Sequence, residues 1–276
     1  MEKPASLSKR QIQNLRALRK KSGRSEQLQF IVEGHRAVMQ VLENGVLETM
    51  FLVVTAAYLE SAHDKEPDSM MKLLSGGSCP VYQIGERIFQ QLADTDTAQG
   101  VLAVCRLPEP ASVDALLDGK GVLLAADRIR DPGNLGTMVR TAVWFGLKGI
   151  LLSEGTADLF QPKVVRSTAG ATGVLPWLET NLKSFLEQAA ERGWKVRLLD
   201  SGAGSVSHLS AEPTGRDILV AGNEAGGLSG DIRDERYQRL RIDPAAERSP
   251  ISSKPAVESL NASVAAAIVI AHFCPP

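Results

Sequence analysis

The sequence predicts an α/β protein of two domains, and three observations support this fold class. Residues 1–105 alternate between short apolar stretches of strand length and stretches with helical spacing. An apolar segment at residues 121–126, GVLLAA, runs into a polar turn and then a helix. A third apolar segment, DILVA at residues 217–221, runs into a glycine-rich loop. Such alternation of strands and helices is typical of sheets with parallel strands.

We expect the first domain to span residues 1–105 and a proline-containing linker to span residues 106–119. Leucine and isoleucine recur at helical spacing between Ser6 and Gly23, which predicts one helix there. Strands are expected at residues 29–32, 49–54, 81–84 and 101–105, and helices at residues 35–43, 70–74 and 86–92. This is a small alternating unit of ordinary domain size.

The second domain, residues 120–276, is organised around the run Asp127–Gly146. Its turn, DPGN at residues 131–134, has strong turn chemistry. Asn134 stands where a helix N-cap would, and Gly146 can end the helix. Arg140 lies one or two turns into this helix and can point back toward the turn. Polar groups at such a turn lie at the carboxyl end of a strand, where open α/β sheets bind ligands.

The loop Gly222–Gly230, GNEAGGLSG, repeats this arrangement after a second apolar strand and carries one carboxylate, Glu224. Free backbone N–H groups in such a loop can hold a nucleotide-like ligand. Further strands are expected at residues 149–152, 195–199 and 239–242, and helices at residues 184–192 and 259–273.

Residue counts exclude several classes of protein. Hydrophobic content of 43% and charged content of 23% are ordinary for a soluble protein. Three scattered cysteines predict no disulfide framework, and four histidines form no metal-binding pattern, so we expect no metal. No apolar segment is long enough to span a bilayer and no secretory signal is evident, so we expect a cytoplasmic protein without a membrane partner.

Basic residues are concentrated near the N-terminus although the net charge is only −1. Between Lys9 and Arg24 the chain has seven lysines and arginines and no acid. Such a cluster can meet phosphates, or it can be the solvated face of a helix, and the sequence leaves both readings open.

Three segments of the second domain together resemble the signature segments of the SpoU (TrmH-like) RNA 2′-O-ribose methyltransferases of the SPOUT superfamily. They are DRIRDPGNLGTMVRTAVWFG, then ILVAGNEAGGLSGDI, then LRIDP with VESLNASVAAAIVIAHF. QPKVVRSTAGATGVLP is also similar to that family. In the first domain, FIVEGHRAVMQVLENG and DTDTAQGVLAVCRL resemble an L30e-like substrate-binding domain.

The resemblance implies a fold, a cofactor and an assembly. The second domain is expected to end in a deep trefoil knot that binds S-adenosylmethionine. By position in the family's segments, the backbone of Gly222, Ile242 and Leu260 is expected to hold the cofactor. The family forms homodimers, with the site near the subunit interface.

The resemblance also implies catalytic residues. Asn134 and Arg140 match the essential pair of the first segment, Glu224 the acid of the second, and Ser259 and Asn261 the polar pair of the third. The family mechanism makes Arg140 the base, but a guanidinium holds its proton strongly. The alternative is that Arg140 acts as a cation on a phosphate or on the developing alkoxide.

Each of these residues also has an ordinary structural reading. Asn134, Ser259 and Asn261 can serve as helix caps, Arg140 can be a surface residue, and Glu224 can be a loop acid. Their occurrence together, in the family's order, favours the functional reading.

One segment departs from the family pattern. Between Pro244 and Ser259 the chain has extra residues rich in serine and proline, where the family usually has a short link. Asp243 precedes the proline, and the methionine that often follows it is missing. Because this loop should border the cofactor, the departure bears on how the adenine is held.

We therefore predict S-adenosylmethionine-dependent methylation of a ribose 2′-hydroxyl in structured RNA. Ribosomal RNA is preferred over transfer RNA because the extra domain suits a structured RNA. Rival readings are a non-catalytic RNA-binding protein and a glycine-loop nucleotide enzyme, although no GxGxxG or GxxxxGK[ST] motif is present. The candidate RNA-binding residues are Arg16, Arg19, Lys20, Lys163 and Arg166, the last two of which can also be structural.

Overall fold

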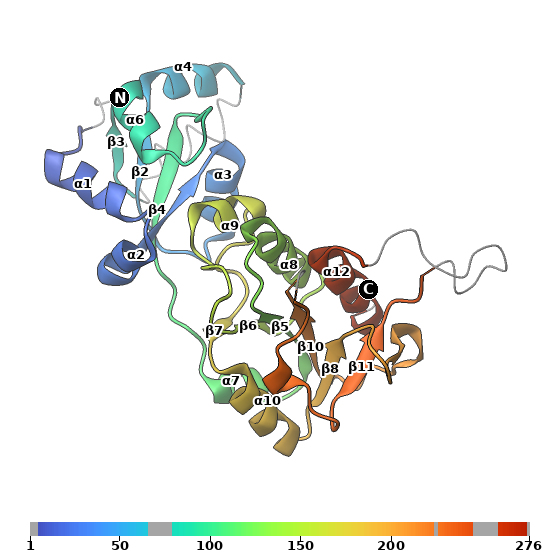
Figure 1. Ribbon diagram of the computed structural model, residues 1–276. Coiled ribbons are helices and arrows are strands. Elements are labelled where there is room, and N and C mark those ends of the chain that lie inside the picture. Colours follow the sequence, from blue (N-terminus) through green and yellow to red (C-terminus); the bar gives the residue numbers. More distant parts are fainter. Residues whose placement is uncertain (1–4, 66–78, 224–225, 245–258, 275–276) are drawn as a thin grey trace. The chain divides into compact units, whose positions relative to one another are not determined.

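The computed structural model describes residues 5–65, 79–223, 226–244 and 259–274, and the chain divides into two units (Figure 1). Unit 1 comprises residues 1–109 together with residues 158–174. Unit 2 comprises residues 110–157 together with residues 175–276. A short stretch from the second half of the sequence therefore packs with the N-terminal residues.

Unit 1 is built on a four-stranded mixed sheet with the strand order β1-β4-β2-β3. β4 runs antiparallel to β1 and β2, and β2 runs parallel to β3. The strands, close to the predicted segments, are β1 Gln29–Glu33, β2 Thr49–Val54, β3 Val81–Gln83 and β4 Val101–Arg106. The helices that follow the first three strands are α3 His35–Asn44, α4 Ala56–Lys65 and α6 Glu86–Leu92. The helix predicted at residues 70–74 lies outside the described residues.

The single helix predicted over Ser6–Gly23 is in fact two helices, α1 Lys9–Ala17 and α2 Lys21–Gln27. Lys20 has an extended backbone with φ −101° and ψ 145°, which interrupts the helical hydrogen bonds. The two helices approach so closely that a β-carbon on Gly23 would lie 2.2 Å from the Ala17 carbonyl oxygen. The break depends on this tertiary contact, which only glycine permits, and the helical spacing gave no sign of it.

Helix α9, Pro162–Ser167, belongs to unit 1, and contacts of the residues just before it show why. The guanidinium of Arg24 is 3% exposed and lies 2.7 Å from the carboxylate of Asp158. The rings of Phe30 and Phe160 pack with their centroids 5.0 Å apart. Because a buried charge that loses its partner is strongly destabilising, the ion pair fixes this segment to α2.

Unit 2 holds a seven-stranded sheet in the order β7-β6-β5-β10-β8-β11-β9, and all its pairings between described strands are parallel. The strands are β5 Gly121–Asp127, β6 Gly149–Leu152, β7 Trp177–Glu179, β8 Lys195–Leu199, β9 Val206–Ser207, β10 Arg216–Gly222 and β11 Gln238–Arg241. The α/β class is therefore confirmed. β7 and β9 were not predicted, because strands of three and two residues show no measurable period.

The helices of unit 2 bury apolar side chains against this sheet. Leu116, Phe185 and Leu186 join the core formed with β5, β8 and β10, and full burial of each such side chain contributes about 1.5–3 kcal/mol. α8 and α12 lie side by side (Figure 1). The helices are α7 Val113–Leu117, α8 Pro132–Trp144, α10 Leu182–Glu191 and α12 Ala262–Phe273, with 3₁₀ turns at His208–Ser210 and Gly230–Ile232.

Candidate active site

The predicted site lies at the carboxyl edge of the sheet in unit 2. Neighbouring parallel strands end on the same side, so β5, β6 and β10 present their last residues along one edge. Asp127 at the end of β5 and Gly222 at the end of β10 are partners in the strand register. The turn into α8 and the loop after β10 therefore begin side by side, which is where open α/β sheets bind ligands.

Three polar side chains from α8 and the start of α12 are in direct contact. Asn261 Nδ2 donates a hydrogen bond to Asn134 Oδ1 at 2.9 Å. The hydroxyl of Ser263 lies 2.6 Å from Asn261 Oδ1 and 3.3 Å from Asn134 Oδ1. Because the hydroxyl has one proton, the shorter contact holds it. The first and third signature segments therefore meet through Asn134 and Asn261, with Ser263 completing the cluster.

The start of α8 differs from the prediction in a way that matters for Asn134. The helix N-cap is Asp131, whose Oδ1 accepts a hydrogen bond from the Asn134 backbone N–H at 2.8 Å. Pro132 occupies the first helical position, where its fixed φ suits the helix. Asn134 therefore lies inside the first turn, and its side chain contacts α12 instead of capping its own helix.

The start of α12 also differs from the prediction. The helix begins at Ala262, not at Ser259, and Asn261 is its N-cap. Asn261 Oδ1 accepts hydrogen bonds from the backbone N–H groups of Ser263 at 2.9 Å and Val264 at 3.3 Å. Asn261 thus caps α12 with its side-chain oxygen and contacts Asn134 with its side-chain nitrogen. Its role as a helix cap is therefore compatible with a place in the candidate site.

The other predicted catalytic residues are not part of this hydrogen-bonded cluster among the described residues. Arg140 lies on the exposed face of α8, and within the described residues no hydrogen bond or ion pair of its side chain is found. Ser259 is exposed just before α12. Glu224 lies outside the described residues. The side chains brought into contact are therefore Asn134 and Asn261, while Arg140 projects into solvent.

The loop after β10 closes tightly on itself. The backbone N–H of Asn223 donates to Gly227 O at 3.1 Å, and the N–H of Gly227 donates to Asn223 O at 2.8 Å. A β-carbon on Gly222 would lie 2.5 Å from the carbonyl carbon of Gly227 and 2.6 Å from Leu228 N. Glycine at position 222 is therefore required by the backbone of the loop itself.

The other two predicted cofactor residues follow β11 and precede α12. Ile242 is half-buried directly after β11, and the side chain of Leu260 is 45% exposed directly before Asn261. Asp243, which departs from the family pattern, accepts hydrogen bonds from Arg241 Nε at 2.8 Å and from the Ser207 hydroxyl. Asp243 therefore ties the end of β11 to β9.

A cavity of about 380 Å³ opens at the same edge of the sheet, over the ends of β5, β6 and β7. None of the predicted catalytic or cofactor residues that the structure describes lines it. Charges of both signs surround it, from Arg128, Glu154, Glu179, Lys183 and Asp231. This cavity therefore does not coincide with the predicted site.

The five predicted RNA-binding residues all belong to unit 1. Arg16 donates a hydrogen bond to Gln91, and Arg19 lies 3.6 Å from Asp94. Arg166 lies 2.7 Å from the same Asp94 carboxylate and 3.9 Å from that of Glu33. Lys20 and Lys163 are exposed.

Three further observations concern the chemistry available to the chain. No group of three or more histidine, cysteine or acidic side chains among the described residues could hold a metal ion. Burial raises the pKa of the Cys105 thiol to about 12, so this cysteine keeps its proton and is a poor nucleophile. Within the part of the chain that the structure describes, no helix has both the length and the apolar character needed to cross a membrane.

Comparison with known families gives two matches, one to each half of the sequence. Residues 121–271 match the SpoU rRNA Methylase family. Residues 9–103 match the MRM3-like substrate binding domain. The first match contains every predicted catalytic and cofactor residue, and the second contains Arg16, Arg19 and Lys20.

Individual relatives are similar over the full length of the chain. The 23S rRNA (guanosine(2553)-2′-O)-methyltransferase RlmP of Bacillus subtilis is 30% identical over 275 residues, which is 99% of both chains. An S-adenosylmethionine-bound rRNA methyltransferase from Sinorhizobium meliloti has a TM-score of 0.78 at 26% identity, covering 98% of this chain and 95% of that one. A TrmH-family RNA methyltransferase structure from Porphyromonas gingivalis has a TM-score of 0.75 at 32% identity, covering 98% of both.

Proposed function

Since the chain belongs to the SpoU rRNA Methylase family, we propose that it transfers a methyl group from S-adenosylmethionine to a ribose 2′-hydroxyl in structured RNA. The observation that carries this proposal is the hydrogen bond between Asn134 and Asn261, which are 127 residues apart in the chain. It joins the first and third signature segments. Methyl transfer is mainly a problem of positioning, and such a contact fixes positions.

The residues at this edge fit S-adenosylmethionine. The backbone of the closed loop after Gly222 offers polar groups, and Leu260 leaves aliphatic surface exposed beside Asn261. An adenosyl group needs both kinds of surface. When bound, the cofactor supplies an electrophilic methyl group on its sulfonium. In the proposed site the backbone of Gly222, Ile242 and Leu260 holds it.

The chain's own side chains then bind and orient the RNA. Asn134 and Asn261 form a rigid pair, because each is fixed by the other and by Ser263. They orient the ribose, and Arg140, exposed about two turns further along α8, holds a phosphate or the developing alkoxide as a cation. Glu224 and Ser259 remain predicted members of this site. The trefoil knot also remains a prediction, since residues 245–258 lie outside the described residues.

Ribosomal RNA is the preferred substrate and transfer RNA the second candidate. The Bacillus subtilis relative is named for 23S rRNA, and unit 1 corresponds largely to a substrate-binding domain that suits structured RNA. A cytoplasmic location, where such RNA is available, is part of the same proposal.

Incubation of the protein with total bacterial RNA and S-adenosylmethionine labelled in its methyl group tests this function. We expect label in large ribosomal RNA, released as a 2′-O-methyl nucleoside on digestion, and its loss in Asn134→Ala. Label only in transfer RNA would favour the second candidate. Cofactor binding without label in any RNA would favour a non-catalytic RNA-binding protein.

Exposed apolar side chains on the adjacent helices α8 and α12 support a homodimer. Trp144 at the end of α8 is 84% exposed, and Val264 and Ile268 lie exposed one turn apart on α12. α8 and α12 lie side by side (Figure 1). Large apolar side chains gathered on adjacent helices are typical of an interface. We propose that a second copy of the chain covers this face, as the family's assembly implies.

Sedimentation velocity tests this assembly. Wild type is expected to sediment as a dimer, and Ile268→Asp as a monomer, because an aspartate would be buried without a partner in the interface. Leu28→Asp is the matched control, since Leu28 is an exposed leucine of unit 1 outside this face. A monomeric wild type, or a dimer that survives Ile268→Asp, would remove the proposed interface.

A further inference from the structure

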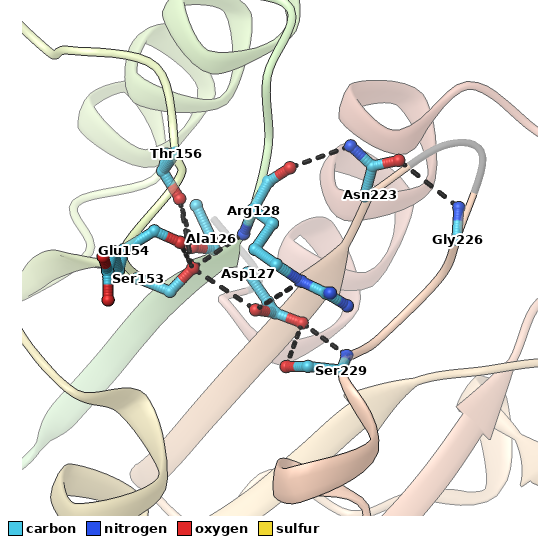
Figure 2. A network of polar contacts seen from close by, with 9 residues as sticks. All are labelled: Ala126, Asp127, Arg128, Ser153, Glu154, Thr156, Asn223, Gly226 and Ser229. Carbon is cyan, nitrogen blue, oxygen red and sulfur yellow. Dashed lines mark hydrogen bonds and ion pairs between the residues drawn. The ribbon is translucent and has the colours of Figure 1, made fainter.

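The carboxylate of Asp127 is buried at the centre of a polar network between β5 and the loop after β10 (Figure 2). Asp127 is 2% exposed. Its Oδ2 accepts hydrogen bonds from Ser229 N at 2.6 Å and from the Ser229 hydroxyl at 2.7 Å. Its Oδ1 lies 3.3 Å from the Ser153 hydroxyl and 3.5 Å from Arg128 Nε. A buried carboxylate needs such partners, and here two of them come from one residue of the loop.

Residues 127 and 128 hold the loop at both of its ends. At one end, Gly222 is the register partner of Asp127, and Asn223 Nδ2 donates to Arg128 O at 2.8 Å (Figure 2). At the other end, Ser229 binds the Asp127 carboxylate. The loop that begins at Gly222 is thus closed onto the end of β5 by hydrogen bonds to two adjacent residues.

Apolar packing anchors the same loop at one described side chain, Leu228, which belongs to the core of unit 2. Leu228 is the one buried side chain among its described residues. A β-carbon on Gly226 or Gly230 would have no neighbour within 4 Å. Apart from Leu228, the described part of the loop is therefore held by hydrogen bonds.

Arg128 has a strained backbone that belongs to the same network. Its φ is +54°, a region that residues other than glycine rarely adopt, at a cost of about 1–3 kcal/mol. Its N–H donates to the Ser153 hydroxyl at 2.8 Å, and its carbonyl accepts from Asn223. This backbone conformation directs the Arg128 carbonyl toward the loop, and the hydrogen bonds from both sides maintain it.

We infer that Asp127 and Ser229 are positioning residues for cofactor binding, because they hold the described parts of this loop, residues 222–223 and 226–230, in the binding conformation. The inference rests on the proposed function, in which the backbone of Gly222 holds S-adenosylmethionine. Neither residue needs to touch the cofactor. Their loss lets the loop move away from β5, and cofactor affinity falls while the rest of the fold remains.

The chain supplies a closely matched control at the other end of β10. Asp217 is fully buried, and its Oδ2 accepts hydrogen bonds from Thr214 N at 2.7 Å and from the Thr214 hydroxyl at 2.8 Å. This is the same pairing that Ser229 makes with Asp127, but it lies at the amino end of the strand. Thr214→Ala therefore removes an equivalent hydroxyl hydrogen bond far along β10 from the loop.

Calorimetric titration with S-adenosylmethionine, without RNA, tests the inference. We expect Ser229→Ala to raise Kd about ten-fold, Ser229→Thr to restore it, and Thr214→Ala to change it by less than about two-fold. Thermal unfolding should show similar losses of Tm for the two alanine variants. Asp127→Asn should raise Kd further, and combining it with Ser229→Ala should add little, because both changes break one contact.

The possible results distinguish a failure of the positioning role of Asp127 and Ser229 from a failure of the proposed function. A wild type that binds no S-adenosylmethionine, alone or with RNA, would overturn the proposed function. A wild type that binds while Ser229→Ala binds equally well would overturn only the positioning role. Equal losses of affinity in Ser229→Ala and Thr214→Ala would also overturn it, since they would show a general effect of reduced stability.

Discussion

Replacing Arg140 with alanine is expected to lower kcat by about 10²–10³-fold, because it removes a cation that stabilises charge developing in the transition state. Arg140 is exposed on α8, two turns from the Asn134–Asn261 contact, and its side chain has no structural partner among the described residues. Its loss should therefore leave the fold and the Kd for S-adenosylmethionine unchanged. Single-turnover methylation, calorimetry and thermal unfolding on the same preparation measure these three quantities.

Arg192→Ala is the control for this prediction. Arg192 is also exposed in unit 2, where it pairs with Asp114 at 2.7 Å, and it lies at the far end of α10. Its removal should leave kcat unchanged. If Arg140→Ala kept the wild-type kcat, neither the base nor the cation role could stand.

Arg140→Lys distinguishes the two roles. A lysine keeps the positive charge but presents it as a single ammonium, so a cation role predicts a partial loss of rate with an unchanged pH profile. A base role predicts a profile displaced to lower pH, because a lysine gives up its proton at lower pH than an arginine. The pH dependence of kcat for the two enzymes therefore decides between them.

Much of the fold could be predicted because short, mainly apolar runs mark buried strands. β2, β6 and β8 occupy the predicted residues, and each is a short run that ends at a polar residue. Gly146 follows α8 with φ +67°, the left-handed conformation expected of a glycine after a helix. These features are local, and local sequence is sufficient to specify them.

The features that the sequence did not reveal depend on contacts between distant residues. Ser263 looks like an ordinary small residue in the first turn of a helix, and its importance appears only when Asn134 is found beside it. Asp127 looks like the polar end of a strand, and its burial depends on Ser229, 102 residues later. Helix α9 has the pattern of any short amphipathic helix, which cannot show that it packs with unit 1.

The second large effect is expected in RNA binding by the N-terminal helices. Arg16, Arg19 and Lys20 are exposed in unit 1, and each phosphate contact that is lost should reduce the slope of log K against log salt by about 0.7–0.9. We expect their joint replacement by glutamine to weaken RNA binding about 10–10²-fold at physiological salt and to flatten the slope by about 2–3. Filter binding of structured ribosomal RNA fragments at several salt concentrations measures both quantities.

The control variant removes three positive charges from unit 2, at the amino edge of its sheet. Lys120, Arg192 and Lys195 are exposed near the amino ends of β5 and β8, away from the carboxyl edge that holds the candidate site. Their joint replacement by glutamine should leave the salt slope unchanged. Equal slopes for the two triple variants would indicate that Arg16 on α1, and Arg19 and Lys20 between α1 and α2, form a solvated surface that does not bind RNA.

Variants of Lys163 and Arg166, which both lie on α9, distinguish phosphate binding from a structural ion pair. Arg166 lies 2.7 Å from the Asp94 carboxylate, whereas Arg19 lies 3.6 Å from it and is more exposed. Arg166→Gln should therefore cost stability, by about 1 kcal/mol or less because the pair is partly exposed, without changing the salt slope. Lys163 is exposed, and Lys163→Gln should flatten the slope at unchanged stability. If Arg166→Gln flattened the slope instead, the guanidinium would have to leave Asp94 to meet the RNA, and RNA binding would then compete with an ion pair inside unit 1.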